Sequence, residues 1–330
     1  MGPLEHDDAP YVSTGQLPSP EQVRRTVDEA YERYRAAAGG QRSRVYPALA
    51  RVPADLFGIC AVGTRGGVYE TGDADYGFAI MSVAKPFVFA LICQALGPEA
   101  AREQLGANAT GLPFNSLAAV ERGPDGRTNP MVNAGAITTA SMAPGGSQDE
   151  RWGFLRSGLS RFAGRPLGLD EEVYASASAS NHRNRALANL LETDSRLGCD
   201  PAEAVDLYTR QSCVQVSATG LAVMGATLAN AGVNPLTGER VVDGPVCHFT
   251  LAVMTTAGLY ETSGDWLYDV GVPGKSGIGG GIVGVSPGKG ALASFAPPLD
   301  EFGNSVKGQL AARFLSRRLG LTLFASEPAT

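Results

Sequence analysis

The stretch Ile80-Met81-Ser82-Val83-Ala84-Lys85-Pro86-Phe87 is predicted to carry the chemistry of this chain, with the rest of the chain as the scaffold around it. An apolar, strand-like run over residues 76–80 precedes it, and residues 87–96 are rich in helix formers and end at a Gly-Pro pair. Ser82 is therefore predicted at the start of a helix, with Lys85 three residues later on the same face.

That geometry suits nucleophilic catalysis. A serine hydroxyl needs a base to take its proton, and a lysine can serve as that base if burial lowers its pKa. The first turn of a helix also offers unpaired N–H groups, which favour negative charge developing near Ser82.

A solvated, capped helix start is the alternative, because the same spacing recurs in Ser286-Pro287-Gly288-Lys289, which is predicted to be a hairpin turn. The composition favours the catalytic interpretation. Only four of the 27 basic residues are lysines, Lys85, Lys275, Lys289 and Lys307, so arginine is the ordinary cation of this chain. Arginine stays charged and cannot act as a base.

Length and charge restrict the classes of function. With 330 residues, 44% of them hydrophobic and 18% charged, the chain is predicted to be globular and large enough for two lobes. A net charge of -6 gives no basic surface for nucleic acid, and no block of like charge suggests a membrane surface. The acidic N-terminus is unlike a secretory signal, so we expect a cytoplasmic protein whose partner is a small molecule.

The cysteines and histidines predict neither disulfides nor a metal site. Five widely spaced cysteines are expected to be reduced core residues: Cys60, Cys93, Cys199, Cys213 and Cys247. Histidine occurs only at positions 6, 182 and 248, which matches no usual zinc spacing.

The pattern of elements predicts an α+β fold. Residues 1–18 are expected to be a flexible tail, and Ser19-Pro20-Glu21-Gln22 predicts the start of a helix that runs to about residue 38. Strands are predicted at 56–62, 68–71, 76–80, 281–286 and 291–296, and a last helix at about 304–319.

These elements assign residues 19–85 and 250–326 to an α/β lobe, with one antiparallel sheet and flanking terminal helices. Residues 86–249 form a mainly helical lobe, the two together make one catalytic domain, and the pocket is expected between them.

A second lysine motif supports an active site. Pro273-Gly274-Lys275-Ser276-Gly277-Ile278-Gly279-Gly280-Gly281 is dense in glycine and leads into a predicted strand, where a backbone without side chains can approach a ligand closely. A bulged edge strand is its alternative interpretation. Ser-x-x-Lys followed far downstream by Lys-Ser/Thr-Gly is the order found in penicillin-recognising serine enzymes.

Further motifs then narrow the assignment. The chain resembles the serine-dependent glutaminase family over about residues 45 to 320, with the following blocks in order: Gly72-Asp73-Ala74-Asp75-Tyr76, Ser82-x-x-Lys85, Leu112-Pro113-Phe114-Asn115-Ser116, Asn129-Pro130-Met131-Val132-Asn133-Ala134-Gly135-Ala136-Ile137, Arg183-Asn184, Gly258-Leu259-Tyr260 and Lys275-Ser276-Gly277. The resemblance implies hydrolysis of L-glutamine to L-glutamate and ammonia on a β-lactamase-like fold, without a metal or organic cofactor. It also implies a homo-oligomer, either a dimer or a tetramer.

The resemblance also implies the roles of individual residues. Ser82 matches the nucleophile and Lys85 its base, while Lys275 supports the proton network. Matched substrate-binding positions are Asn133, Asn184, Tyr208, Tyr260, which also helps to move protons, and Ile278, whose backbone N–H would join that of Ser82 in the oxyanion hole. Taken singly, these tyrosines and asparagines are more often core aromatics and loop or cap residues.

Two positions depart from the family pattern. Ala177 stands where the family usually has a glutamate that holds the substrate's amino group, and whether Asn181 or Ser178 replaces it stays open. Val45 stands where the family generally has a tyrosine, with Tyr46 one step later. These departures motivate a non-catalytic amino-acid-binding protein as one alternative, and the two lysine motifs alone would also allow a penicillin-recognising peptidase or β-lactamase.

Overall fold

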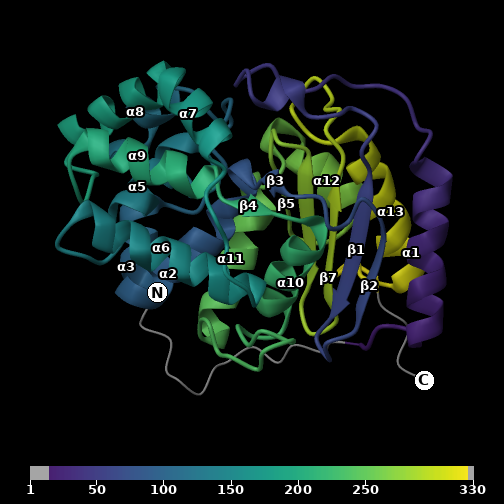
Figure 1. Cartoon of the computed structure of the whole chain (residues 1–330). Coiled ribbons are helices and arrows are strands. Elements are labelled where there is room, and N and C mark those ends of the chain that lie inside the picture. Colours follow the sequence, from purple (N-terminus) through teal and green to yellow (C-terminus); the bar gives the residue numbers. More distant parts are fainter. Residues whose placement is uncertain (1–14, 326–330) are drawn as a thin grey trace.

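The computed structural model describes residues 15–325, and its centre is a five-stranded antiparallel sheet (Figure 1). The strand order is β2-β1-β7-β6-β5. The strands are β1 (Gly58–Gly63), β2 (Val68–Gly72), β5 (Gly274–Ser276), β6 (Gly281–Ser286) and β7 (Gly290–Phe295). Since β1 pairs with β7 over its whole length, both ends of the chain build one sheet, as predicted.

Strand β1 shows how this sheet is buried on both faces. Ile59 and Ala61 join an apolar cluster with α1 (Pro20–Tyr34) and α13 (Val306–Leu319), while Cys60 and Val62 join the cluster formed with the helices from the middle of the chain. This alternation follows from the two-residue period of a strand. The terminal helices α1 and α13 thus cover one face, and α10 (Ala218–Ala229) packs against the other (Figure 1).

The ends of the terminal helices agree with their capping signals. The side chain of Ser19 accepts a hydrogen bond from the backbone N–H of Gln22, and that of Ser305 accepts one from Gly308. Helix α1 ends at Tyr34, about one turn earlier than predicted, and α13 begins at Val306. Most of the predicted tail, residues 1–14, lies outside the described part of the chain.

The prediction of a third strand of the main sheet at residues 76–80 is wrong. Only β3 (Phe78–Ala79) is extended, and it pairs with β4 (Gln215–Val216) in a separate two-stranded sheet. The ring of Phe78 stacks on Phe295 of β7 with 4.2 Å between centroids. Side-chain packing, not backbone pairing, therefore places this segment over the main sheet, and its backbone is free to turn into the next helix.

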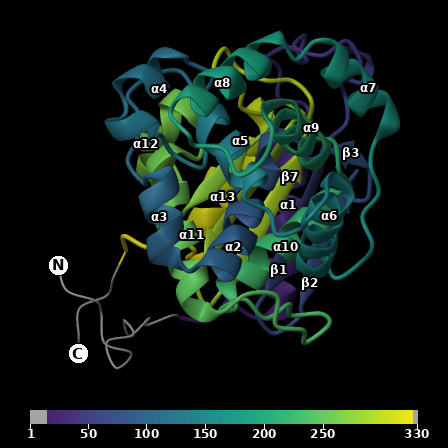
Figure 2. The same cartoon turned by 90° about the vertical axis from the view of Figure 1, so that its left-hand side faces the viewer.

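That helix, α2 (Ala84–Leu96), is the centre of the helical region (Figure 2). All of its residues from 84 to 93 are buried, since α3 (Pro98–Leu105), α5 (Asn133–Ser141), α6 (Gln148–Ala163) and α11 (Gly244–Ala257) pack around it. A helix that is apolar on all sides belongs in a core. The remaining helices are α4 (Ala118–Arg122), α7 (Glu171–Ala179), α8 (His182–Thr193), α9 (Pro201–Ser212) and α12 (Ser263–Asp269).

The boundaries of the two predicted lobes stay a prediction. Helix α10 lies within the predicted helical lobe by sequence, yet it packs on the sheet. The five cysteines are free thiols, four of them buried and Cys199 partly exposed. Among residues 15–325, no helix combines the length and apolar character needed to cross a bilayer.

Candidate active site

Ser82 lies in a single 3-10 turn, Met81–Val83, directly before α2. Met81 has a positive φ of 51°, which is strained for a residue with a long side chain. This strained turn connects the small sheet to α2 and leaves Ser82 at the N-terminal end of the helix, on the wall of a cavity.

Lys85 lies one helical turn later and is 1% exposed. Its Nζ donates to Oδ1 of Asn133 at 2.7 Å and to the carbonyl of Met131 at 3.4 Å. Burial lowers the pKa of Lys85 to about 7. A large fraction of this side chain is therefore neutral near pH 7, and a neutral amine can accept a proton.

Asn129 holds the segment that receives this lysine. Its Nδ2 donates to the carbonyls of Ala107 and Asn108 and to Oγ1 of Thr256, while its Oδ1 accepts the backbone N–H of Met131. Asn129 belongs to one of the sequence blocks that carry the family resemblance, but the sequence does not predict its anchoring role. The signal that could have found it is an asparagine at the start of a loop dense in small residues.

The side chain of Asn133 begins a buried chain of amides. Its Nδ2 donates to Oδ1 of Asn184 at 3.0 Å, whose Nδ2 donates to Oδ1 of Asn181, whose Nδ2 in turn donates to Oγ1 of Thr209 at 2.6 Å. The hydroxyl of Tyr208 donates to Oδ1 of Asn133 at 3.0 Å. The predicted residues Lys85, Asn133, Asn184 and Tyr208 thus form one hydrogen-bonded network, which extends through Asn181.

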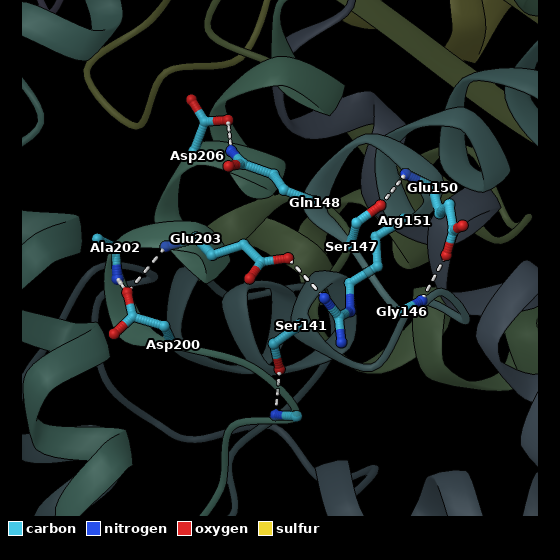
Figure 3. Close-up of polar contacts among 11 residues, drawn as sticks. Ser141, Gly146, Ser147, Gln148, Glu150, Arg151, Asp200, Ala202, Glu203 and Asp206 are labelled. Carbon is cyan, nitrogen blue, oxygen red and sulfur yellow. Dashed lines mark hydrogen bonds and ion pairs between the residues drawn. The ribbon is translucent and has the colours of Figure 1, made fainter.

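Helix α9, which carries Tyr208, is fixed by polar contacts to α6 (Figure 3). Arg151 pairs with Glu203 at 2.8 Å, and Nε2 of Gln148 donates to Asp206 at 2.5 Å. Asp200 caps the start of α9 by accepting the backbone N–H groups of Ala202 and Glu203. These contacts hold α9 in place against α6.

The second lysine lies on β5, which packs against the turn that contains Ser82. Lys275 is fully buried, donates to the carbonyls of Gly258 and Ser276, and has its Nζ 4.6 Å from the ring centroid of Tyr260. Burial, with a smaller contribution from the charge of Lys85, lowers the pKa of Lys275 well below its usual value.

Tyr260 begins a 3-10 turn, Tyr260–Thr262, and has a strained φ of 54°. Burial raises the pKa of its hydroxyl to about 12, against the opposing effect of hydrogen bonds with Ser82 and Ser276. The hydroxyl is therefore a proton donor at neutral pH, and it lies next to Ser82.

Gly277 lets the glycine-rich segment approach Ser82. A Cβ at position 277 would lie 3.0 Å from the carbonyl of Ile80 and 3.3 Å from the backbone nitrogen of Ser82. Among the described residues, no backbone carbonyl accepts the N–H of either Ser82 or Ile278. These two N–H groups are available to an oxyanion.

Asn304 fixes this segment and had not been predicted. Its side chain is fully buried, accepts the hydroxyl of Ser276 at 2.5 Å and donates to Thr262 at 3.0 Å. It therefore ties β5 to the turn of Tyr260. Nothing in the local sequence around Asn304 indicates this role, because its partners are far away in the chain.

A cavity of about 120 Å³ opens beside Ser82. Five predicted residues line it: Ser82, Asn133, Asn184, Tyr208 and Ile278. Asn181 lines the cavity, and so do three residues at the positions that depart from the family pattern: Ala177, Val45 and Tyr46. Ser178 is not on its wall. A larger surface cavity, of about 750 Å³, lies between α3 and α4 and contains none of the predicted residues.

The sheet and the helices around it have the β-lactamase-like fold of the solved glutaminase structures. A model of the family described as Glutaminase matches residues 40–324. The chain belongs to the glutaminase family, whose members are amidohydrolases.

Three comparisons illustrate this membership. "Glutaminase 2" of Yersinia pestis is 66% identical over 320 residues, which cover 97% of this chain and 94% of the relative. A solved structure described as a probable glutaminase has 42% identity and a TM-score of 0.92, and the match covers 94% of this chain and all of the other. The structure of a protein called Mglu, described as its glutamate form, has 37% identity and a TM-score of 0.84 and covers 94% of this chain and 71% of the other.

Proposed function

We propose that this glutaminase hydrolyses the side-chain amide of L-glutamine to L-glutamate and ammonia through a covalent intermediate on Ser82. Family membership supports the reaction. The observation that carries the mechanism is that Ser82 is one turn from a buried lysine whose pKa is lowered to about 7. A serine and a neutral lysine are a nucleophile and a base.

Acylation begins when Lys85 accepts the proton of Ser82 as the serine oxygen attacks the amide carbon. The electron pair of the C=O bond moves to oxygen, and this oxyanion accepts hydrogen bonds from the N–H groups of Ser82 and Ile278. Each such donor contributes about 3 kcal/mol to stabilisation of the transition state.

The C–N bond then breaks as the leaving nitrogen gains a proton and departs as ammonia. Tyr260 is a suitable donor because its hydroxyl is protonated at neutral pH and lies beside Ser82. The proton that Lys85 took from Ser82 then passes to Tyr260, which leaves Tyr260 protonated and Lys85 neutral for the next step, and Lys275 supports this transfer from its position beside the ring of Tyr260. Asn133, Asn184 and Tyr208, which line the same cavity as Ser82, bind the substrate.

Water completes the cycle. It attacks the ester carbon of the acyl-enzyme, a neutral Lys85 takes a proton from it, and the proton returns to Ser82 as glutamate leaves. In none of these reaction steps does a cofactor supply a reacting group. A cytoplasmic location and assembly as a homo-dimer or homo-tetramer remain predictions.

The test is release of ammonia and glutamate from L-glutamine by the purified protein and by Ser82→Ala. We expect turnover by the wild type and a loss of about 1,000-fold or more in the variant. Ser286→Ala is the matched control, because Ser286 has the same spacing to a lysine but lies at the end of β6, in the hairpin. Turnover of a chromogenic β-lactam in place of glutamine would contradict the proposal, as would full activity of Ser82→Ala.

A further inference from the structure

The charge on the wall of the cavity is positive. Arg183 is the only charged side chain among the residues that line it, and there is no carboxylate. Arg183 is exposed and donates its Nε–H to the carbonyl of Asn115 at 2.6 Å. Its terminal NH2 groups make no hydrogen bond within residues 15–325, so they are free to receive an anion.

The asparagine side chains on the wall already use part of their hydrogen-bonding capacity within the protein. Oδ1 of Asn133 already accepts two hydrogen bonds, from Lys85 and Tyr208, which uses both of its lone pairs. Oδ1 of Asn184 and Oδ1 of Asn181 each accept one. Each of these amides has a second N–H that makes no hydrogen bond within residues 15–325, so the three side chains together have three unused donors and two unused acceptor positions.

The wall near Ala177 is apolar. Ala177 is 1% exposed and belongs to a cluster with Met81, Cys213 and, at its edge, Tyr46 and Ile278. An ammonium group placed against this cluster would lose water without gaining a charged acceptor, which is unfavourable. A hydrogen atom or a carbonyl group in the same place would lose little.

We propose that the cavity recognises its substrates by their carboxylate and amide groups alone, so that a free α-ammonium group contributes little to catalysis. This inference rests on the proposed function, because it concerns the substrates of the same Ser82 site. The predicted substrates are five-carbon carboxylic acids that carry an amide group at the far end of the chain. Their α-carbon carries an amino group, an oxo group or no substituent. Glutaramate, which is glutamine without its amino group, is the simplest member.

The first experiment compares kcat/KM for glutaramate and L-glutamine in the wild-type protein, by ammonia release. Values within about tenfold of each other support the proposal. Glutamine preferred by more than about tenfold would overturn it and leave the proposed function intact. Release of ammonia from neither amide would contradict the proposed function itself.

The second experiment adds a carboxylate to the apolar wall. Ala177→Glu and its uncharged match Ala177→Gln place side chains of equal size in the cavity, so that the ratio between them isolates the effect of charge. Ala177→Glu should shift the preference towards glutamine by about tenfold or more relative to Ala177→Gln. Equal ratios in two folded variants would overturn the proposal, and if either variant fails to fold, the wild-type ratio decides.

Discussion

Nζ of Lys85 and Oδ1 of Asn133 are 2.7 Å apart, and both side chains are buried. An amide oxygen stabilises an ammonium by hydrogen bonding but carries no net charge, so it orients the lysine without cancelling the effect of burial. The pair therefore combines two properties that a base needs, a fixed position and a pKa near neutrality.

The first prediction concerns pH. Because Lys85 must be neutral to accept the serine proton and its pKa is about 7, kcat/KM should rise with pH and reach half its plateau near pH 7. The measurement is a pH profile with glutamine from pH 5 to 9. A profile that is flat across this range would contradict the role of Lys85 as the base, and Lys289→Met, in the half-buried hairpin between β6 and β7, should leave the profile unchanged.

Asn133→Asp gives a sharper form of this prediction. The new carboxylate would lie beside Nζ of Lys85 and should raise the pKa of the lysine by about 1–3 units. The acid limb of the profile should therefore move to higher pH, with lower activity at pH 7. Asn184→Asp, one hydrogen bond further from the lysine, should move the limb less, and equal shifts in both variants would be incompatible with a local effect on Lys85.

Lys85→Met should abolish turnover and increase stability. Between pH 7 and 10.5 the unfolded chain holds a proton on Lys85 that the folded chain does not, so stability rises with pH across that window and the cost of burying the lysine is largest below it. Methionine should raise the free energy of unfolding at pH 7 by about 2 kcal/mol, after allowing for the lost hydrogen bonds. Urea denaturation measures this, and a gain that does not shrink towards pH 10.5 would argue against the assigned pKa.

Gly277→Ala tests the approach of the glycine-rich segment to Ser82. Its methyl group would lie 3.0 Å from the carbonyl of Ile80, so the segment must move away from the nucleophile. We expect kcat to fall by about tenfold or more with a smaller change in KM, since the oxyanion is held only in the transition state. Gly153→Ala in α6 has no neighbour within 4 Å of its added methyl and should retain full activity.

The ion pair Arg151–Glu203 should contribute to stability, because its side chains are only 17% and 19% exposed. A double-mutant cycle with alanine at both positions should give a coupling energy of about 1 kcal/mol. The exposed pair Arg35–Glu32 at the C-terminal end of α1 is the control and should couple by about 0.3 kcal/mol. Equal coupling in the two pairs would show that burial does not strengthen the first.

Much of the fold could be predicted because local signals and burial agree. The caps of α1 and α13, the alternation in β1 and the Pro-Gly hairpin between β6 and β7 all depend on neighbouring residues. The separate pairing of β3 with β4 could not be predicted in this way, since its partner lies about 140 residues away and the pairing is set by tertiary packing.

The residues of the site also divide into those that local sequence predicts and those that only the folded chain brings together. Ser82, Lys85 and Lys275 follow from short motifs whose spacing has a chemical reason. Asn304 and Asn129 could not be recognised from their surroundings, because each acts by joining segments that meet only in the folded chain. Val45 stands where the family generally has a tyrosine, and Tyr46 follows it. Both residues line the cavity, so Tyr46 is within the site although it is one position later in the chain.

The central claim is that Ser82 forms an acyl-enzyme, and partition of that intermediate tests it most directly. Hydrolysis of L-glutamine and of the γ-methyl ester of L-glutamate is measured in the presence of hydroxylamine, which competes with water for the acyl group. A common acyl-enzyme predicts the same ratio of hydroxamate to glutamate from both substrates, and loss of both products in Ser82→Ala. Different ratios from the amide and the ester, or hydroxamate formation that survives in Ser82→Ala, would contradict the account.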